Sequence, residues 1–299
     1  MHDELGDRMK QSYEDRTRFL LPRRTYTIIR VDGKAFHTFT KGFKRPYDGD
    51  LMTMMDNTAI ALCEAIQGSV LAYTQSDEIS VLLTDFAKPS TNAWFDGNVQ
   101  KQCSIAAACA TMAFNNQMLK NSFSKDNDHE MKTDVLAILA DCFKMAMFDA
   151  RVFTIPDPVE VENYLIWRQN DASRNSVQMA ARAVYSHKAL EGKGIPELHE
   201  LLHQKGINWN DYTSGEKRGR AIVRRQYPVD IKHGHGGALP EEPLTVMRNK
   251  WVSLSGGTNE ETPLFTRDRS FLRNLIPLLP GVNFVSDEPK GQASPYDCG

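Results

Sequence analysis

Two short acidic motifs in the first third of this chain are candidates for a shared metal site. Asp32 follows a run of β-branched and aromatic residues, and Asp77 lies between two similar runs. Mg²⁺ binds a few carboxylates and completes its shell with phosphate oxygens and water. Two such ions about 4 Å apart activate an attacking hydroxyl and stabilise a pyrophosphate leaving group. The residue types therefore indicate nucleotidyl transfer, with Gly33 allowing close approach of a triphosphate. Asp-Gly and Ser-Asp-Glu are also common turn sequences, so an ordinary turn remains the alternative for each motif.

The elements around these motifs predict how they are positioned. Thr25–Val31 is rich in β-branched and aromatic residues, which favours a buried strand. Apolar residues then recur at spacings of three and four over Asp50–Gln67, which predicts a helix with one buried face. Ser69–Thr74 and Ile79–Thr84 form two strands separated by so few residues that a tight hairpin is expected. In a split βαβ sheet built from these elements, the first strand and the hairpin are neighbours, so Asp32 and Asp77 are expected to lie close together.

The first half of the chain predicts an α+β domain. Val99–Met118 is an alanine-rich helix, Thr133 can cap a further helix, and Ala150–Thr154 is a closing strand. If the second of these helices is an insertion, the order is βαββαβ. We therefore predict a ferredoxin-like palm domain over residues 1–155, with an antiparallel sheet and helices on one face.

The second half, residues 156–299, predicts a mixed helical and β-hairpin extension, in which we expect RNA binding. Val159–Ser186 is helical in pattern, and Pro196 begins a short helix that ends near Gln204. Gly219–Val229 and Leu244–Leu254 are expected strands, joined by a His-Gly-rich loop, and the tail from residue 276 is expected to be irregular.

Composition sets limits on the class of protein. The 299 residues are 41% hydrophobic and 25% charged, an ordinary globular balance. The net charge is 36 − 38 = −2, so any binding to nucleic acid must depend on local groups of basic residues. The five cysteines are odd in number and lack a Cys-x-x-Cys pair, which indicates reduced thiols. With no long apolar run or signal-peptide core, we expect a cytoplasmic protein that does not bind membranes.

Basic residues gather in two segments. Residues 34–45 carry Lys34, Lys41, Lys44 and Arg45 with interleaved phenylalanines, which suits a triphosphate, while the aromatic rings either stack on bases or pack. Residues 214–225 carry five basic residues against one glutamate, which suits RNA; a solvated strand pair is the alternative. The chain has neither a P-loop motif nor a Gly-x-Gly-x-x-Gly fingerprint.

Four motifs in order resemble the tRNA-histidine guanylyltransferase superfamily between about Tyr26 and Arg225. The motifs are VDGKAFHTF (31–39), YTQSDEIS (73–80), FDARVF (148–153) and YLIWRQND (164–171). The resemblance implies a polymerase-like palm that works in the 3′-to-5′ direction on tRNA 5′ ends. It also implies two Mg²⁺ ions, ATP and GTP or another NTP as substrates, and a homotetramer with subunit contacts in residues 156–299.

The resemblance assigns roles to individual residues. Asp32 and Asp77 would bind both metal ions with the Gly33 backbone oxygen, and Glu78 would join the two aspartates as a catalytic residue. Arg45 stands where the family usually has lysine in its Phe-x-Lys-Pro motif. The implied nucleotide-binding residues are Gly33, Lys34, Ala35, Phe36, His37, Arg45, Asp48 and Ser76. The residues assigned to RNA or phosphate binding, from the motifs and the basic patch, are Lys101, Ser104, Arg168, Asn175, Lys217, Arg218 and Gly219.

One departure bears on the subtype. Enzymes dedicated to tRNA-histidine carry His-Ile-Asn-Asn after the WRQ-x-D motif, whereas this chain has Ser173-Arg174-Asn175-Ser176. The sequence therefore favours the "-like" branch, which repairs truncated tRNA 5′ ends by templated addition after activating a 5′-monophosphate with ATP. The alternatives are a dedicated tRNA-histidine guanylyltransferase, a palm cyclase that uses NTP without RNA, and a non-catalytic RNA-binding protein.

Overall fold

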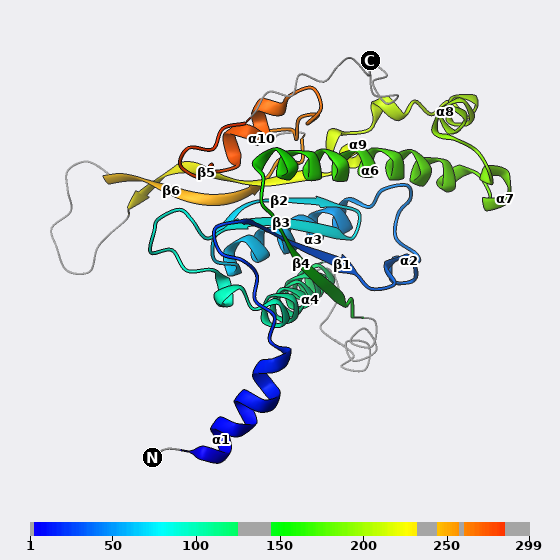
Figure 1. Cartoon of the computed structure of the whole chain (residues 1–299). Coiled ribbons are helices and arrows are strands. Elements are labelled where there is room, and N and C mark those ends of the chain that lie inside the picture. The colour runs from blue at the N-terminus through cyan, green and yellow to red at the C-terminus, as the bar shows by residue number, and fades with distance from the viewer. Residues whose placement is uncertain (1–2, 125–144, 232–243, 257–259, 285–299) are drawn as a thin grey trace.

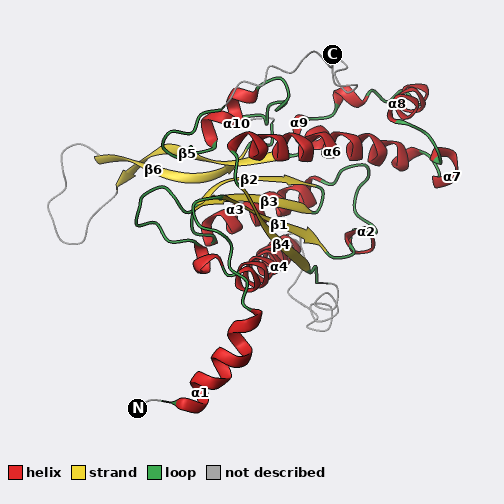
Figure 2. Cartoon of the chain, in the orientation of Figure 1, coloured by secondary structure: helices red, strands yellow, loops and turns green. Residues whose placement is uncertain are grey.

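The computed structural model describes residues 3–124, 145–231, 244–256 and 260–284, and its centre is an antiparallel sheet (Figures 1 and 2). Six strands run in the order β4-β1-β3-β2-β5-β6. Their bounds are β1 (Tyr26–Gly33), β2 (Ser69–Gln75), β3 (Glu78–Thr84), β4 (Phe148–Ile155), β5 (Arg220–Ile231) and β6 (Leu244–Ser253).

The four inner strands form the expected palm. β1 lies between β3 and β4, and β2 and β3 are joined by a turn of two residues, Ser76 and Asp77. Helix α3 (Gly49–Ala65) connects β1 to β2, and α4 (Val99–Ser124) follows β3. The βαββαβ order and the tight hairpin are thereby confirmed. The helix expected after Thr133 lies outside the described residues.

Both faces of the sheet are covered by helices. Ile29, Val31 and the buried sides of α3 and α4 form one core. Tyr26 and Ile28 point to the other face, where they pack with α6 (Pro158–Val184) and α10 (Arg269–Leu275). Side chains alternate along a strand, so burial on both faces explains why the neighbouring residues Ile28 and Ile29 are both apolar. The palm helices occupy one face as expected, and the extension supplies the other layer.

The hairpin of the second half joins the palm sheet. β5 pairs with β2 through Ala72 and Ile222, and β6 pairs with β5 over its length. This pairing links the segments on either side of residue 155, and the division into 1–155 and 156–299 remains a prediction. The shorter elements are α1 (Glu4–Met9), α2 (Phe36–Phe39), α7 (His187–Leu190), α8 (Ile195–Gln204), α9 (Ser214–Arg218), a π-helical turn (Lys10–Glu14) and 3-10 turns at Asp15–Thr17, Trp94–Gly97 and Trp209–Asp211.

The N-terminal helix projects from the body (Figure 1), and no residue of α1 is buried. Charged residues of this helix, Glu4, Asp7 and Arg8, suit an exposed position. Among the described residues, no helix has the length and hydropathy needed to cross a bilayer. Cys63, Cys103 and Cys109 are free thiols, as expected, while Cys142 and Cys298 lie outside the described residues.

Candidate active site

The sheet brings the two aspartates together. Asp32 lies at the end of β1 and is paired in register with Glu78, the first residue of β3. Asp77 immediately precedes Glu78 in the hairpin turn, and the Gly33 N–H donates a hydrogen bond of 3.0 Å to the Asp77 carbonyl. The expected proximity of Asp32 and Asp77 is therefore a feature of this fold. Ser76, before Asp77, has the left-handed φ of 50° that closes so short a turn.

The aspartate pair brings two carboxylates together at one end of the sheet. Burial raises the pKa of Asp77, hydrogen bonds from the Ser76 side chain and the Asp77 backbone lower it, and the charge of Asp32 raises it again. The Asp32 side chain is 43% exposed, and the Arg151 guanidinium lies 4.0 Å from it. A cation placed between the two aspartates would remove this repulsion.

These residues fit Mg²⁺. Among the described residues, no three His, Cys, Asp or Glu side chains are grouped for metal binding. Mg²⁺ does not need such a cage, because one or two carboxylates suffice when phosphate oxygens and water complete the shell. Asp32 and Asp77 would hold the ion or ions, and the Gly33 backbone oxygen would be a further hard ligand.

Glu78 is bound by an arginine of helix α6. Arg168 on α6 donates from Nε to Oε1 of Glu78 at 2.8 Å and from Nη2 to Oε2 at 2.6 Å. The Arg168 side chain is 7% exposed and the Glu78 side chain 12%. Burial raises the pKa of Glu78, and Arg168 opposes that shift. The bidentate pair fixes Glu78 next to Asp77, so both Glu78 oxygens are used within the protein.

The ion pair continues along α6 as a network that the motif analysis had not identified. Arg168 also donates to Asp171 at 3.1 Å, and Asp171 accepts from Arg174 at 3.1 Å and from Asn175 at 3.4 Å. The positions of Arg168, Asp171 and Arg174 at intervals of three put these side chains on one helix face. That spacing was the available signal in the sequence. The predicted RNA-binding role of Arg168 remains a prediction; in the structure it holds Glu78.

The segment after Asp32 turns sharply because of its backbone and an aromatic ring. A Cβ on Gly33 would overlap the Phe36 ring, so glycine is required there. Ala35 has φ 54° and ψ 36° and begins α2. The Lys34 N–H is taken by the Met147 carbonyl at 2.8 Å, whereas Lys34, Ala35 and His37 are exposed. Phe36 packs on Phe39, Phe114 and Phe148, which resolves the open choice for this ring in favour of packing.

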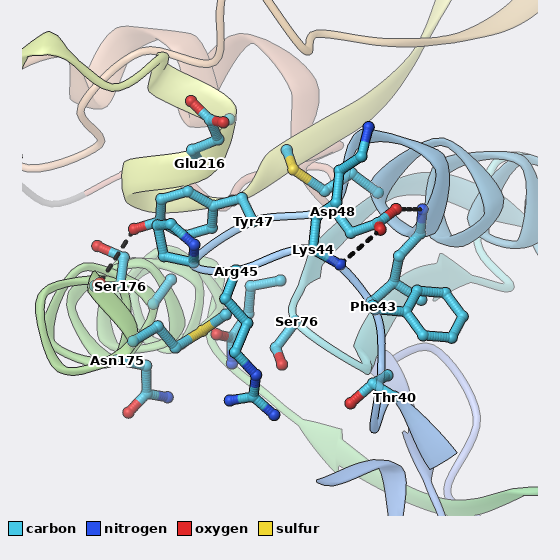
Figure 3. A pocket seen from close by; sticks show the side chains of 18 of the residues that line it. Thr40, Phe43, Lys44, Arg45, Tyr47, Asp48, Ser76, Asn175, Ser176 and Glu216 are labelled. Carbon is cyan, nitrogen blue, oxygen red and sulfur yellow. Dashed lines mark hydrogen bonds between the residues drawn. The ribbon is translucent and has the colours of Figure 1, made fainter. Parts of the chain in front are cut away.

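A pocket of about 130 Å³ lies beside the turn that carries Asp77, and several of the predicted site residues line it (Figure 3). Its lining includes Arg45, Asp48, Ser76, Asn175 and Gly219, from four separate stretches of the chain. The loop of Arg45 and Asp48, the hairpin turn, α6 and the α9–β5 junction thus meet at one place.

Two interactions fix the loop that forms the pocket wall. The two carboxylate oxygens of Asp48 accept from the Leu51 N–H at 2.9 Å and the Lys44 N–H at 3.0 Å, so Asp48 caps α3 and closes the loop (Figure 3). The Tyr47 hydroxyl donates to the Ser176 carbonyl at 3.0 Å and ties the loop to α6.

Two of the residues predicted to bind RNA lie away from the aspartate pair. Lys101 and Ser104 are exposed near the start of α4. They lie about 15–20 Å along that helix from Phe114, which packs beside the active-site loop. The structure therefore does not bring these two residues to the aspartate pair, and their RNA-binding role remains a prediction.

The basic patch at residues 214–225 is divided among different surroundings. Lys217 donates to the Asn210 carbonyl at 2.7 Å, and burial lowers its pKa. Burial also lowers the pKa of Arg218. Arg220 is 2% exposed, and its Nε pairs with Asp56 at 2.5 Å. Sequence reasoning missed that buried pair, because the Asp56 side chain is on a helix 164 residues earlier.

Comparisons with known proteins agree with this geometry. A family model described as tRNAHis guanylyltransferase matches residues 6–156. A bacterial tRNA(His) guanylyltransferase-like protein solved in complex with ATP is 35% identical over 92% of this chain and 100% of that chain, with a TM-score of 0.71. A structure of the same description in complex with GTP is 34% identical, with equal coverage and a TM-score of 0.69. The tRNA(His) guanylyltransferase of Schizosaccharomyces pombe is 28% identical over 71% of this chain and 77% of that protein.

A palm sheet with paired aspartates at the hairpin turn defines a nucleotidyltransferase of the polymerase-palm class. The family match extends this to the substrate class, a tRNA 5′ end. The chain belongs to the tRNA-histidine guanylyltransferase family. The structural match also reaches beyond the motif-bearing segment 26–225, so most of the C-terminal region belongs to the shared architecture.

Proposed function

We propose that this protein is a template-dependent 3′-to-5′ nucleotidyltransferase that adds nucleotides to the 5′ end of truncated tRNA, with Mg²⁺ as its metal. The observation that carries the proposal is the Asp32–Asp77 pair beside a pocket lined by Arg45, Ser76 and Asn175. ATP and GTP complexes of bacterial relatives support nucleoside triphosphates as substrates.

The reaction has two transfers. A tRNA 5′-monophosphate attacks the α-phosphorus of ATP, which forms an adenylylated 5′ end and releases pyrophosphate. The 3′-hydroxyl of the incoming NTP then attacks the activated 5′ phosphorus and releases AMP. A tRNA that already has a 5′-triphosphate skips the first transfer and releases pyrophosphate in the second.

Each group of residues has a proposed part in these transfers. Mg²⁺, held by Asp32 and Asp77, would neutralise phosphate charge and activate the attacking oxygen. Residues 33–37 would wrap the triphosphate, with the left-handed Ala35 orienting backbone N–H groups toward it. Arg45 would pair with phosphate oxygens, and Asp48 would fix the loop near the incoming base. Arg168 would hold Glu78, and through it the turn that carries Asp77.

The "-like" branch is favoured by two observations. Residues 173–176 lack the histidine that the dedicated enzymes carry after the WRQ-x-D motif, and two of these residues, Asn175 and Ser176, line the pocket. Identity to the bacterial guanylyltransferase-like proteins is also higher than identity to the S. pombe guanylyltransferase. The homotetramer, the cytoplasmic location and the RNA contacts at Lys101, Ser104, Lys217 and Arg218 are parts of the proposal that rest on family resemblance and composition.

The test is extension of the tRNA 5′ end. The protein is incubated with Mg²⁺, ATP and all four NTPs, and either a 5′-truncated tRNA or a full-length tRNA-histidine that lacks its extra guanosine. We expect templated extension of the truncated tRNA, and loss of extension in Asp77→Asn. Asp96→Asn, at an aspartate with a 75% exposed side chain, is the matched control and keeps activity. No extension by the wild type, or full activity of Asp77→Asn, contradicts the proposal.

A dedicated tRNA-histidine guanylyltransferase is the second candidate, favoured by the description of the matching family model. It would add one guanosine to tRNA-histidine opposite an unpaired position and leave the truncated tRNA unextended. The same two substrates therefore decide between the candidates.

A further inference from the structure

The outer part of the β5–β6 hairpin has a cationic face that the active site does not use. Among the described residues, β5 pairs with the palm only through Arg220–Ile222, opposite residues 72–74 of β2. Beyond these residues the hairpin projects from the rest of the sheet (Figure 1).

Register decides which hairpin side chains share a face. Val223 and Val252 are paired, and both pack in the apolar cluster beneath α10. Side chains alternate along each strand, so the residues two and four positions farther out lie on the same side of the hairpin. This cationic face carries Arg225 opposite Lys250 and Tyr227 opposite Arg248.

The pairing on this face is unfavourable within the protein alone. Like charges directly opposite each other on antiparallel strands repel. Glu260 binds Arg225 at 2.6 Å, and among the described residues no ion pair is formed by Arg248 or Lys250. Both side chains are exposed, and Tyr227 is 39% exposed. Three cations, one carboxylate and an accessible aromatic ring are complementary to a polyanion.

We propose that the cationic face of Arg225, Tyr227, Arg248 and Lys250 binds the phosphate backbone of the tRNA away from its reacting 5′ end. Gly219 lines the pocket, and Arg225 follows it by six strand residues, about 20 Å at ~3.4 Å per residue. Tyr227 and Arg248 lie about 7 Å farther out. The hairpin thus holds the body of a long RNA while the 5′ end occupies the pocket. This inference rests on tRNA being the substrate.

The test is the salt dependence of tRNA binding. Each lost phosphate contact lowers the slope of log K against log salt by roughly 0.7–0.9. We expect Arg248→Gln/Lys250→Gln to lower the slope by about 1.4–1.8 and to weaken binding. Lys188→Gln/Lys193→Gln removes the same charge from two exposed positions near α7 and keeps the wild-type slope. Affinity for ATP stays unchanged in both variants, because the pocket is untouched.

The outcomes separate this inference from the proposed function. If the wild type extends and binds tRNA but the hairpin variant keeps the slope of the control, the cationic face is wrong and the function stands. If the wild type binds tRNA with the expected hairpin contribution but never extends it, the proposed function fails while the binding face stands. Replacing Lys250 removes its repulsion with Arg225, so the hairpin variant should not have a lower midpoint of thermal unfolding than the wild type. A lower midpoint contradicts the inference that Arg225 and Lys250 form an unfavourable pair.

Discussion

Replacing Arg168 by alanine would leave the buried carboxylate of Glu78 without its partner. Arg168 donates two hydrogen bonds to Glu78 and one to Asp171, and both members of the main pair are nearly inaccessible to water. Removing one member of a buried ion pair costs about 3–5 kcal/mol, because the remaining charge stays desolvated. We expect Arg168→Ala to lower the free energy of unfolding by that amount.

Urea unfolding followed by circular dichroism measures this effect. Arg174→Ala is the control, because Arg174 binds the same Asp171 from a side chain that is 40% exposed. Its loss should cost about 0–1 kcal/mol. The double variant Arg168→Met/Glu78→Leu removes both charges and should recover most of the stability, since apolar replacement of a buried pair is often neutral.

Two results would refute the reasoning. The first is an Arg168→Ala variant that is as stable as the Arg174→Ala control. The second is a double variant that is no more stable than Arg168→Ala. The first result means that water reaches Glu78 in solution. The second means that the loss comes from packing of the arginine stem rather than from an unpaired charge.

Three further predictions concern single positions. Gly33→Ala forces the Phe36 ring to move, so it should lower the free energy of unfolding in urea by about 1–3 kcal/mol and abolish tRNA extension. Unchanged extension would show that this turn is not needed. Gly219→Ala places a side chain at φ 74° against the Tyr73 hydroxyl and should cost at least about 1 kcal/mol; a wild-type unfolding curve would contradict this. Cys63 is buried, and burial raises the pKa of its thiol, so iodoacetamide at pH 8 should modify Cys63 only when urea unfolds the protein. Detection of the Cys63 adduct in the native protein by mass spectrometry would contradict this prediction.

Local sequence patterns determined much of the palm. β-branched runs and apolar residues at intervals of three and four are properties of neighbouring residues, so β1 to β4, α3 and α4 were predictable. The placement of Asp32 beside Asp77 followed from topology alone, because a βαββαβ order leaves the first strand next to the central hairpin. Short elements such as α2, α9 and α10 were missed, since their few residues carry too little periodic signal.

The partners of individual charges were decided only by the tertiary structure. Within the basic patch, Arg220 is buried against Asp56, Lys217 is bound to a backbone carbonyl, and Arg225, opposite Lys250 of the next strand, is paired with Glu260. Glu78 binds an arginine 90 residues later. A sequence gives the type and spacing of a charged side chain, but its environment depends on strand register and on distant elements packed against it. The sequence alone therefore determined which reactive residue types this protein has, and the fold decided which charges remain exposed and which are paired inside the protein.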